Sequence, residues 1–83
     1  MIQPKSFTVL VPRSNPALTQ DLKNGIRFKC PRSGISLKQA ADDYCRIEVA
    51  AGTSLLETWW AVRQVVSDVE RRHKSGRVIE MIG

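Results

Sequence analysis

The fold is decided by residues 54–74, which read SLLETWWAVRQVVSDVERRHK. Ser54 and Glu57 have the spacing of a capping box, in which each side chain satisfies a backbone N–H at a helix start. Apolar residues then recur at intervals of four, three, four and three, which keeps them on one side of a helix. They are Leu55, Trp59, Val62, Val66 and Val69. Ser75-Gly76 follows as a stop signal. The segment predicts a long amphipathic helix over 54–74.

Residues 36–50, which precede this helix, predict a second one. Ser36 and Gln39 again have capping-box spacing, and Gly52 suits a left-handed C-terminal cap. The apolar positions fall along one helix face: Leu37, Ala40, Ala41, Tyr44 and Ala51, with Ile47 at the edge. The alternative is a strand over 44–50, because Cys45, Ile47 and Val49 alternate. Such a strand would form a β-α-β unit with the long helix and a final strand.

Three short strands are predicted outside these helices. Residues 6–11 read SFTVLV, are rich in β-formers and end at a proline. Residues 25–30 read GIRFKC and alternate, with the apolar side chains of Ile26, Phe28 and Cys30 on one side. Residues 77–82 read RVIEMI and predict a closing strand. Residues 17–24 fit one or two helical turns.

These elements predict an α+β fold in a single domain over residues 1–83. It has two adjacent helices, at about 36–50 and 54–74, and short strands at about 6–11, 25–30 and 77–82. A chain of 83 residues buries only about 60% of its unfolded surface, so its core is thin. Because a subunit interface buries further apolar area, we expect a homodimer.

Hydropathy and cysteine usage indicate a compartment. No apolar run reaches the roughly 18 residues that a transmembrane helix needs, and the N-terminal stretch lacks the apolar core of a signal peptide. We therefore expect a cytoplasmic protein without membrane association. In that compartment Cys30 and Cys45 are expected to stay reduced rather than to form a disulfide.

The net charge of +5 is distributed unevenly along the chain. Residues 1–38 contain seven basic residues and one acidic residue, a net charge of +6. Residues 39–83 contain six basic and seven acidic residues, a net charge of −1. A basic half of this kind suggests a polyanionic partner, although charge also serves solubility.

The sequence contains no recognisable catalytic, cofactor or metal site. Its five glycines are scattered singly, so no phosphate-binding loop is formed. Two cysteines and the single histidine, His73, cannot close a four-ligand zinc site without a carboxylate. Asp42 and Asp43 are adjacent and diverge on a helix, and Glu57, Asp68 and Glu70 suit ion pairs on a helix surface. We expect a protein that is not an enzyme, with no catalytic residues, cofactor or metal.

Two surfaces are candidate binding sites, and the first is the predicted strand over 25–30. Arg27 and Lys29 project from it together, with Arg32 and Lys38 close behind. A two-stranded ribbon fits the major groove, where such side chains reach base edges and phosphates. Arg27, Lys29, Arg32 and Lys38 are therefore the predicted nucleic-acid-binding residues. The alternative is a solvated strand face.

The second candidate surface is the back of the long helix. At about 100° per residue, Trp60 lies roughly 140° from the apolar stripe. An exposed tryptophan beside leucine and arginine has the composition of a protein–protein hot spot. The predicted partner-binding residues share that side of the helix: Leu56, Trp60, Arg63, Arg71 and Lys74. The alternative is that Trp60 packs under another element of the chain.

Residues 26–66 resemble the ribbon-helix-helix family of DNA-binding repressors. The resemblance rests on the basic strand IRFKCP, the segment SLKQAADDYCRIEVAA and the turn Gly52-Thr53-Ser54 into a second helix. It implies a dimer whose paired strands insert into the major groove, with Arg27 and Lys29 at the bases. It also implies a phosphate at the helix start, Ser54-Leu55.

Two functions follow from these surfaces. The first is a small DNA-binding transcription regulator of phage or plasmid type, which uses the basic strand on duplex DNA. The alternative is a protein–protein interaction module or inhibitor that binds a protein partner through the Trp60 helix face.

Overall fold

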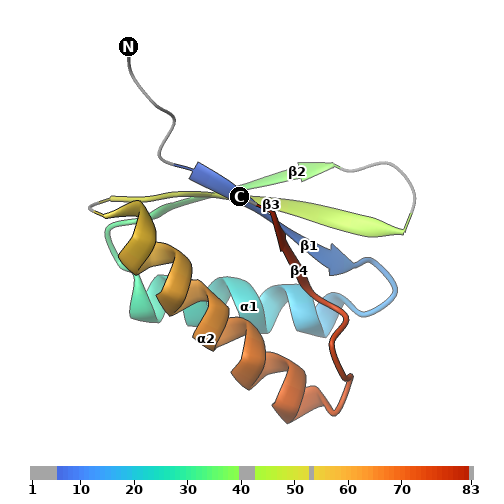
Figure 1. Ribbon diagram of the computed structural model, residues 1–83. Helices are drawn as coiled ribbons and strands as arrows, with labels where there is room; N and C mark the ends of the chain where they lie inside the picture. Colours follow the sequence, from blue (N-terminus) through green and yellow to red (C-terminus); the bar gives the residue numbers. More distant parts are fainter. Residues whose placement is uncertain (1–5, 40–42, 53, 83) are drawn as a thin grey trace.

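The computed structural model describes residues 6–39, 43–52 and 54–82, which form one layer of helices against one sheet (Figure 1). The elements along the chain are β1 (Ser6–Pro12), α1 (Pro16–Lys29), β2 (Gly34–Gln39), β3 (Tyr44–Ala50), α2 (Leu55–His73) and β4 (Glu80–Ile82). The α+β class is confirmed.

The four strands form one antiparallel sheet in the order β2-β3-β1-β4. Because β3 and β4 both run antiparallel to β1, they are parallel to each other with β1 between them. The unit β3-α2-β4 is therefore a split β-α-β motif, and β1-α1-β2 is a second one around β3. The β-α-β arrangement that the sequence left open is the one observed.

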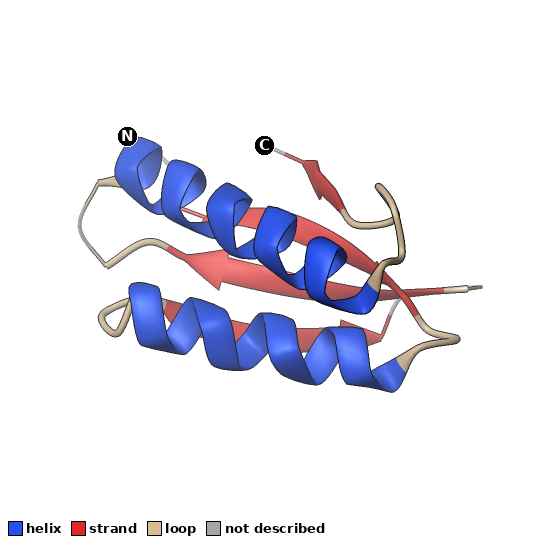
Figure 2. Ribbon diagram, turned by 90° about the horizontal axis from the view of Figure 1, so that it is seen from below, coloured by secondary structure: helices blue, strands red, loops and turns tan. Residues whose placement is uncertain are grey.

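Both helices cover the same face of the sheet, and the other face is open (Figure 2). The core lies between the two layers. Its strand residues alternate along β1 and β3: Phe7, Val9, Val11, Ile47 and Val49. The helices bury Leu18, Leu22 and Ile26 from α1, and Thr58, Val62, Val65, Val66 and Val69 from α2. Strand alternation and helical spacing thus meet in one continuous core.

Helix α2 confirms the predicted amphipathic helix. The Ser54 hydroxyl accepts a hydrogen bond from the backbone N–H of Glu57 at 3.3 Å, as the capping box predicts. At the other end Lys74 adopts a left-handed conformation with a φ of 52°, and its N–H is bonded to the carbonyls of Arg71 and Glu70. Strand β1 confirms the prediction for 6–11.

The predicted strand over 25–30 is wrong, because residues 25–29 form the last part of α1 and Cys30 caps its end. Leu18, Leu22 and Ile26 are spaced by four and share the buried side of the helix. Pro16 at its start has a backbone fixed near helical φ and lacks only an N–H that a helix leaves unbonded. This stripe continues through Asn24-Gly25, although that pair of residues is typical of turns.

Gly25 has a packing role inside α1. A Cβ placed there would lie 2.5 Å from Cγ1 of Val65, so the missing side chain lets α1 approach α2 closely. A glycine in a helix costs about 1 kcal/mol relative to alanine. The close contact between the two helices offsets that cost.

The predicted helix over 36–50 is also wrong. Its ends form β2 and β3, which pair with Ile35 opposite Val49 and Leu37 opposite Ile47. Residues 40–42, including Asp42, lie outside the described residues. The alternation in 44–50 decided the structure, because a strand buries Ile47 and Val49 together. Gly52 is not a left-handed helix cap: a Cβ there would collide with the backbone carbonyl of Arg32.

The closing strand is shorter than the predicted 77–82. Only Glu80–Ile82 pairs with β1, with Met81 opposite Val9. The preceding backbone is bonded to α2 instead, since Oε2 of Glu70 accepts hydrogen bonds from the N–H groups of Val78 at 2.8 Å and Ile79 at 2.9 Å.

Candidate interaction surfaces

The structure does not bring the four predicted nucleic-acid-binding residues together. Arg27 and Lys29 are exposed on the last turns of α1. Residues two positions apart in a helix point about 200° away from each other around its axis. They therefore do not project side by side as they would from a strand. Arg32 is exposed in the following loop, and Lys38 lies on β2.

Lys38 belongs to the open face of the sheet, on the opposite side from the helices. Its Nζ is 2.7 Å from Oε2 of Glu48 on β3. Arg46 is opposite Lys38 in the pairing of β2 with β3, and Glu80 on β4 is opposite Leu10 on β1, so both side chains belong to the open face as well. The described charges of this face are thus two basic and two acidic residues, and Tyr44 is its only aromatic residue among the described strands. The described residues of the open face thus provide neither a basic excess nor an array of aromatic side chains.

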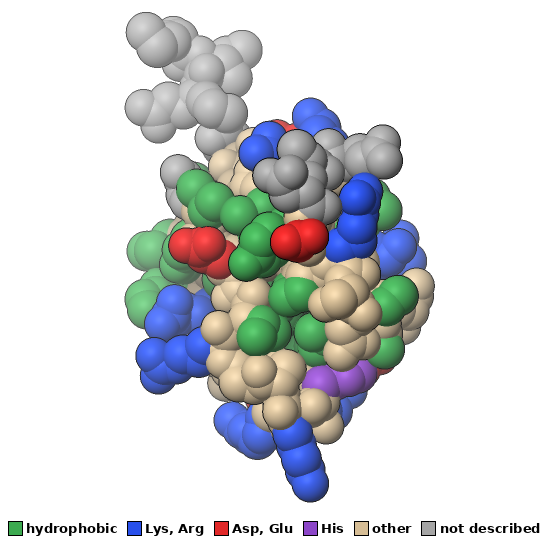
Figure 3. Space-filling model, turned by 90° about the vertical axis from the view of Figure 1, so that its right-hand side faces the viewer, with side chains coloured by type: hydrophobic (Ala, Val, Ile, Leu, Met, Phe, Trp, Pro, Cys, Tyr) green, Lys and Arg blue, Asp and Glu red, His purple; other side chains and the backbone are tan. Residues whose placement is uncertain are grey.

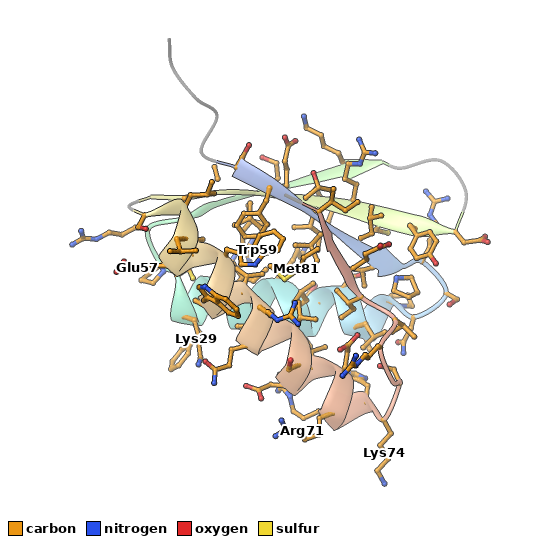
Figure 4. The ribbon with its side chains drawn as sticks, in the orientation of Figure 1. Lys29, Glu57, Trp59, Arg71, Lys74 and Met81 are labelled. Carbon is orange, nitrogen blue, oxygen red and sulfur yellow. The ribbon has the colours of Figure 1, made fainter. Side chains whose placement is uncertain are left out.

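Trp59 and Trp60 lie about 100° apart around the first half of α2, one toward the sheet and one toward solvent. Trp59 points between the helix and the sheet, where its ring meets Phe7 edge-on at a centroid distance of 5.0 Å (Figure 4). Trp60 is 59% exposed. The exposed outer position that helical spacing predicted for Trp60 is confirmed, and the alternative that it packs under another element is wrong.

Trp60 has exposed apolar neighbours on the same turns of α2. Leu56 is 66% exposed, and Leu55 is also exposed. Arg63 follows one turn after Trp59 and Trp60 and is exposed as well. We call Leu56, Trp60 and Arg63 the Trp60 surface, which Leu55 adjoins from the apolar stripe of the helix. Exposed aromatic and leucine side chains beside an arginine are the composition that binding hot spots share.

An apolar groove adjoins the Trp60 surface where the start of α2 meets the start of β1. It has a volume of about 440 Å³ and is lined by Ser6, Phe7, Leu55, Leu56 and Trp59. None of these side chains is charged. Exposed apolar surface that continues into a groove marks an interaction site more often than scattered apolar residues do.

Arg71 and Lys74, the other two predicted partner-binding residues, lie at the opposite end of α2 (Figure 4). At 1.5 Å per residue, Arg71 is roughly 16 Å along the helix from Trp60. Its guanidinium is 4.0 Å from the carboxylate of Asp68. Figure 3 shows Lys and Arg side chains projecting at this lower end of the molecule. The predicted set is therefore an apolar surface at one end of α2 and a basic one at the other.

Phe28 is an exposed aromatic residue that the predicted strand placed on the same apolar side as Ile26. It is 85% exposed on α1, whereas Ile26 is buried. The difference follows from the periodicity of the element. Residues two positions apart lie on the same side of a strand but on nearly opposite sides of a helix. Phe28 lines a hollow between the helices with Gly25 and Val65. The four-residue spacing of Leu18, Leu22 and Ile26 was the signal that could have placed Phe28 outside.

Groups capable of catalysis or metal binding are dispersed. In residues 6–39, 43–52 and 54–82, no three His, Cys, Asp or Glu side chains gather closely enough to hold a metal ion. Cys30 and Cys45 are unpaired. Burial raises the pKa of the Cys30 thiol, although a hydrogen bond with Ser33 and the charge of Lys29 act in the opposite direction. A raised pKa disfavours the reactive thiolate.

His73 is a structural link between the helices. Its Nε2 lies 2.6 Å from Oδ2 of Asp21, so the end of α2 is bonded to α1 across 52 positions of sequence. The partly buried position agrees with the core-edge role that its place on the apolar stripe indicates.

Comparisons with known proteins do not indicate a function, so the functional argument depends on these surfaces. No protein-family model, curated protein or solved structure matches the chain. The segment that resembles ribbon-helix-helix repressors forms helix, strand, strand and helix, rather than strand, helix and helix. Among the described residues, no helix is long and apolar enough to cross a membrane. A split β-α-β fold serves many functions and does not choose among them.

Proposed function

We propose that this protein is a protein–protein interaction module that binds its partner through the Trp60 surface. The observation that carries the proposal is the exposure of Trp60 and Leu56 beside an apolar groove. These side chains are outside the core cluster, to which Trp59 and the valines of α2 contribute. Burial against a partner removes their apolar area from water, at about 25 cal/mol per Å².

Composition supports this surface over the open face of the sheet. The Trp60 surface contributes a tryptophan, a leucine and an arginine. On the open face, Lys38 and Glu48 pair with each other, and a polar, charge-balanced surface loses hydration when a partner covers it. Hot spots concentrate in tryptophan, tyrosine and arginine, and their truncation costs about 2 kcal/mol or more of binding free energy.

The test is affinity capture from cells of the source organism with four baits: wild type, Trp60→Ser, Leu56→Ser and the control Arg46→Ser. Arg46 is exposed on the open face, so its substitution leaves the Trp60 surface intact. We expect one partner that wild type and Arg46→Ser retain and that Trp60→Ser and Leu56→Ser lose. Equal retention by all four folded baits contradicts the proposal.

A second candidate function is DNA binding by a small transcription regulator, which the net charge of +5 supports. The described residues of the open sheet face are charge-balanced, so the excess of positive charge lies on the helices and loops. Arg27, Lys29 and Arg32 are all exposed near the end of α1. Phosphate contacts by these residues would make the affinity for duplex DNA fall steeply with salt. If an Arg27→Ala/Lys29→Ala variant binds duplex DNA as tightly as wild type, this candidate is wrong.

A further inference from the structure

The exposed side of α2 carries a continuous stripe of side chains along the whole helix. Its members recur at intervals of four, three, four, four and three, so those within the helix lie within about 80° of one another around its axis. All six residues are exposed, and we call them the outer stripe: Leu56, Trp60, Arg63, Ser67, Arg71 and Lys74. At 1.5 Å per residue, the outer stripe is about 27 Å long. It extends the Trp60 surface to the C-terminal end of the helix.

Charge divides the outer stripe into two halves. The first half is apolar, and the second ends in the stretch 71–77, RRHKSGR, which has four basic residues and no acidic one. The C-terminal end of a helix carries only about half a negative charge, so the helix dipole does not account for four cations. Arg71 and Lys74 point away from the sheet (Figure 4), and Figure 3 shows basic side chains at the same end. This end of α2 therefore presents positive charge to a partner.

The acidic residues of the second half do not neutralise it. Oε2 of Glu70 accepts hydrogen bonds from the N–H groups of Val78 and Ile79, which hold this carboxylate against the chain. Asp68 lines the hollow between the two helices, and its carboxylate is 4.0 Å from the exposed guanidinium of Arg71. Three basic residues at this end form no ion pair within the described part of the chain: Arg72, Lys74 and Arg77.

The two halves together select the kind of partner. A nucleic acid would place a phosphate at every nucleotide along the stripe, but the first half has no basic residue before Arg63 and has exposed Glu57 beside it. A second copy of the chain would bring the same stripe, which contains no acidic residue to meet the basic end. A protein segment with apolar side chains at one end and acidic side chains at the other complements both halves.

The shape of this face suits a helical segment. Hollows flank the outer stripe on both sides, one between α1 and α2 beside Gly25 and Val65, and one between α2 and the stretch 77–81. A second helix has side chains at the same four- and three-residue spacing, and these enter the furrows beside such a ridge. A helix of about 18 residues matches the length of the stripe.

We propose that the outer stripe binds a helical segment of a partner protein that is apolar at one end and acidic at the other. The apolar end packs on Leu56 and Trp60, and the acidic end meets Arg71 and Lys74. The apolar contacts supply most of the affinity, whereas the charges fix the direction of the segment along α2 and raise the association rate. The inference rests on the proposed function, because it names the class of partner that the same helix recognises.

The experiment measures the binding of a fluorescently labelled peptide to the full chain by fluorescence anisotropy, at low and at high salt. The peptide is an alanine–glutamine helix of about 20 residues. It has leucines on one face of its first half and glutamates on the same face of its second half. We expect high salt to weaken its binding. A peptide with lysines in place of the glutamates should bind about tenfold more weakly at low salt.

Paired variants locate the contact. Arg71→Glu/Lys74→Glu should weaken binding of the glutamate peptide about tenfold at low salt and strengthen binding of the lysine peptide. The matched control is Arg27→Glu/Arg46→Glu, which changes the net charge equally at exposed residues of α1 and β3 and should alter both affinities much less. Arg71→Gln/Lys74→Gln should weaken glutamate-peptide binding by about threefold, without placing acidic side chains at the helix end.

Trp60→Ser separates this inference from the proposed function, because it should weaken both peptides about tenfold at either salt concentration. The inference is overturned if the glutamate peptide does not bind, or if the two Glu variants lose affinity equally. An oligonucleotide that binds more tightly than the peptide, and that Arg71→Glu/Lys74→Glu no longer binds, would also overturn it. In each case a partner that is captured from cells and lost by Trp60→Ser still supports the proposed function. If Trp60→Ser binds the peptide as wild type does and retains every captured partner, both are wrong.

Discussion

The open face of the sheet and the outer surface of α2 have opposite compositions. The sheet face carries balanced charges, with Lys38 and Glu48 paired 2.7 Å apart. The outer surface of α2 carries exposed Trp60 and Leu56 beside an apolar groove. Both surfaces are accessible to a partner. Only on the outer surface of α2 would the burial of apolar side chains supply most of the binding free energy. The difference teaches that the proposed binding surface is distinguished by its apolar side chains rather than by its charge.

The largest expected effect comes from the two sides of β3. Ile47→Ala removes a fully buried side chain from the layer between sheet and helices, and should lower the free energy of unfolding by about 2–5 kcal/mol. Arg46→Ala, on the open face, should change it by about 0.5 kcal/mol or less. Urea denaturation measures both. Similar losses for the two variants would contradict the assignment of an open sheet face.

The adjacent tryptophans should separate core from surface within α2. Trp59→Ala removes the edge-on ring contact with Phe7 and should cost about 3 kcal/mol of stability. Trp60→Ala should cost about 0.5 kcal/mol or less, because the side chain is mostly exposed. Thermal unfolding followed by circular dichroism gives both values. A large loss for Trp60→Ala would mean that this side chain belongs to the fold.

Gly25→Ala tests the part of α1 that the sequence predicted to be a strand. The new Cβ meets Val65, and such overpacking typically costs about 1–3 kcal/mol, which exceeds the gain in helix propensity of about 1 kcal/mol. Val65→Ala should relieve that clash, so the double variant should be more stable than the sum of the single losses predicts. Additive losses would show that residue 25 does not face Val65.

The smallest expected effect concerns the bond that ties the two helices together. Asp21→Asn weakens the contact with His73, and should cost about 1 kcal/mol because both side chains are partly exposed. Asp68→Asn is a suitable control, since its contact with Arg71 is 4.0 Å long and exposed. Unfolding near neutral pH measures the pair. Equal effects of the two substitutions would contradict the inter-helix bond.

The sequence correctly predicted the elements whose apolar residues fit only one periodicity, helical or strand. In α2, the caps and the spacing from Leu55 to Val69 agreed, and β1 had a run of β-formers that ended at Pro12. Residues 25–30 fit two periods, since Ile26, Phe28 and Cys30 alternate while Leu18, Leu22 and Ile26 repeat every four positions. The choice between them depends on close packing of Gly25 against Val65, which is a tertiary contact.

The candidate sites were predictable to the same extent. Helical spacing placed Trp60 outside and Trp59 inside, because α2 itself was correctly predicted. Arg27 and Lys29 were grouped only by the wrong strand. The groove required the relative position of Phe7 and Trp59, which come from elements separated by most of the chain. No local pattern in the sequence specifies that distance.

The central claim, that Trp60 is an exposed binding residue, is tested most directly by fluorescence of a Trp59→Phe variant, in which Trp60 is the only tryptophan. For the free protein, the account predicts red-shifted emission that acrylamide quenches strongly. When the partner retained in affinity capture is added, emission should shift to the blue and quenching should fall. Two results would contradict the account. One is blue-shifted, weakly quenched Trp60 emission in the free protein, and the other is acrylamide quenching that does not change when the partner binds.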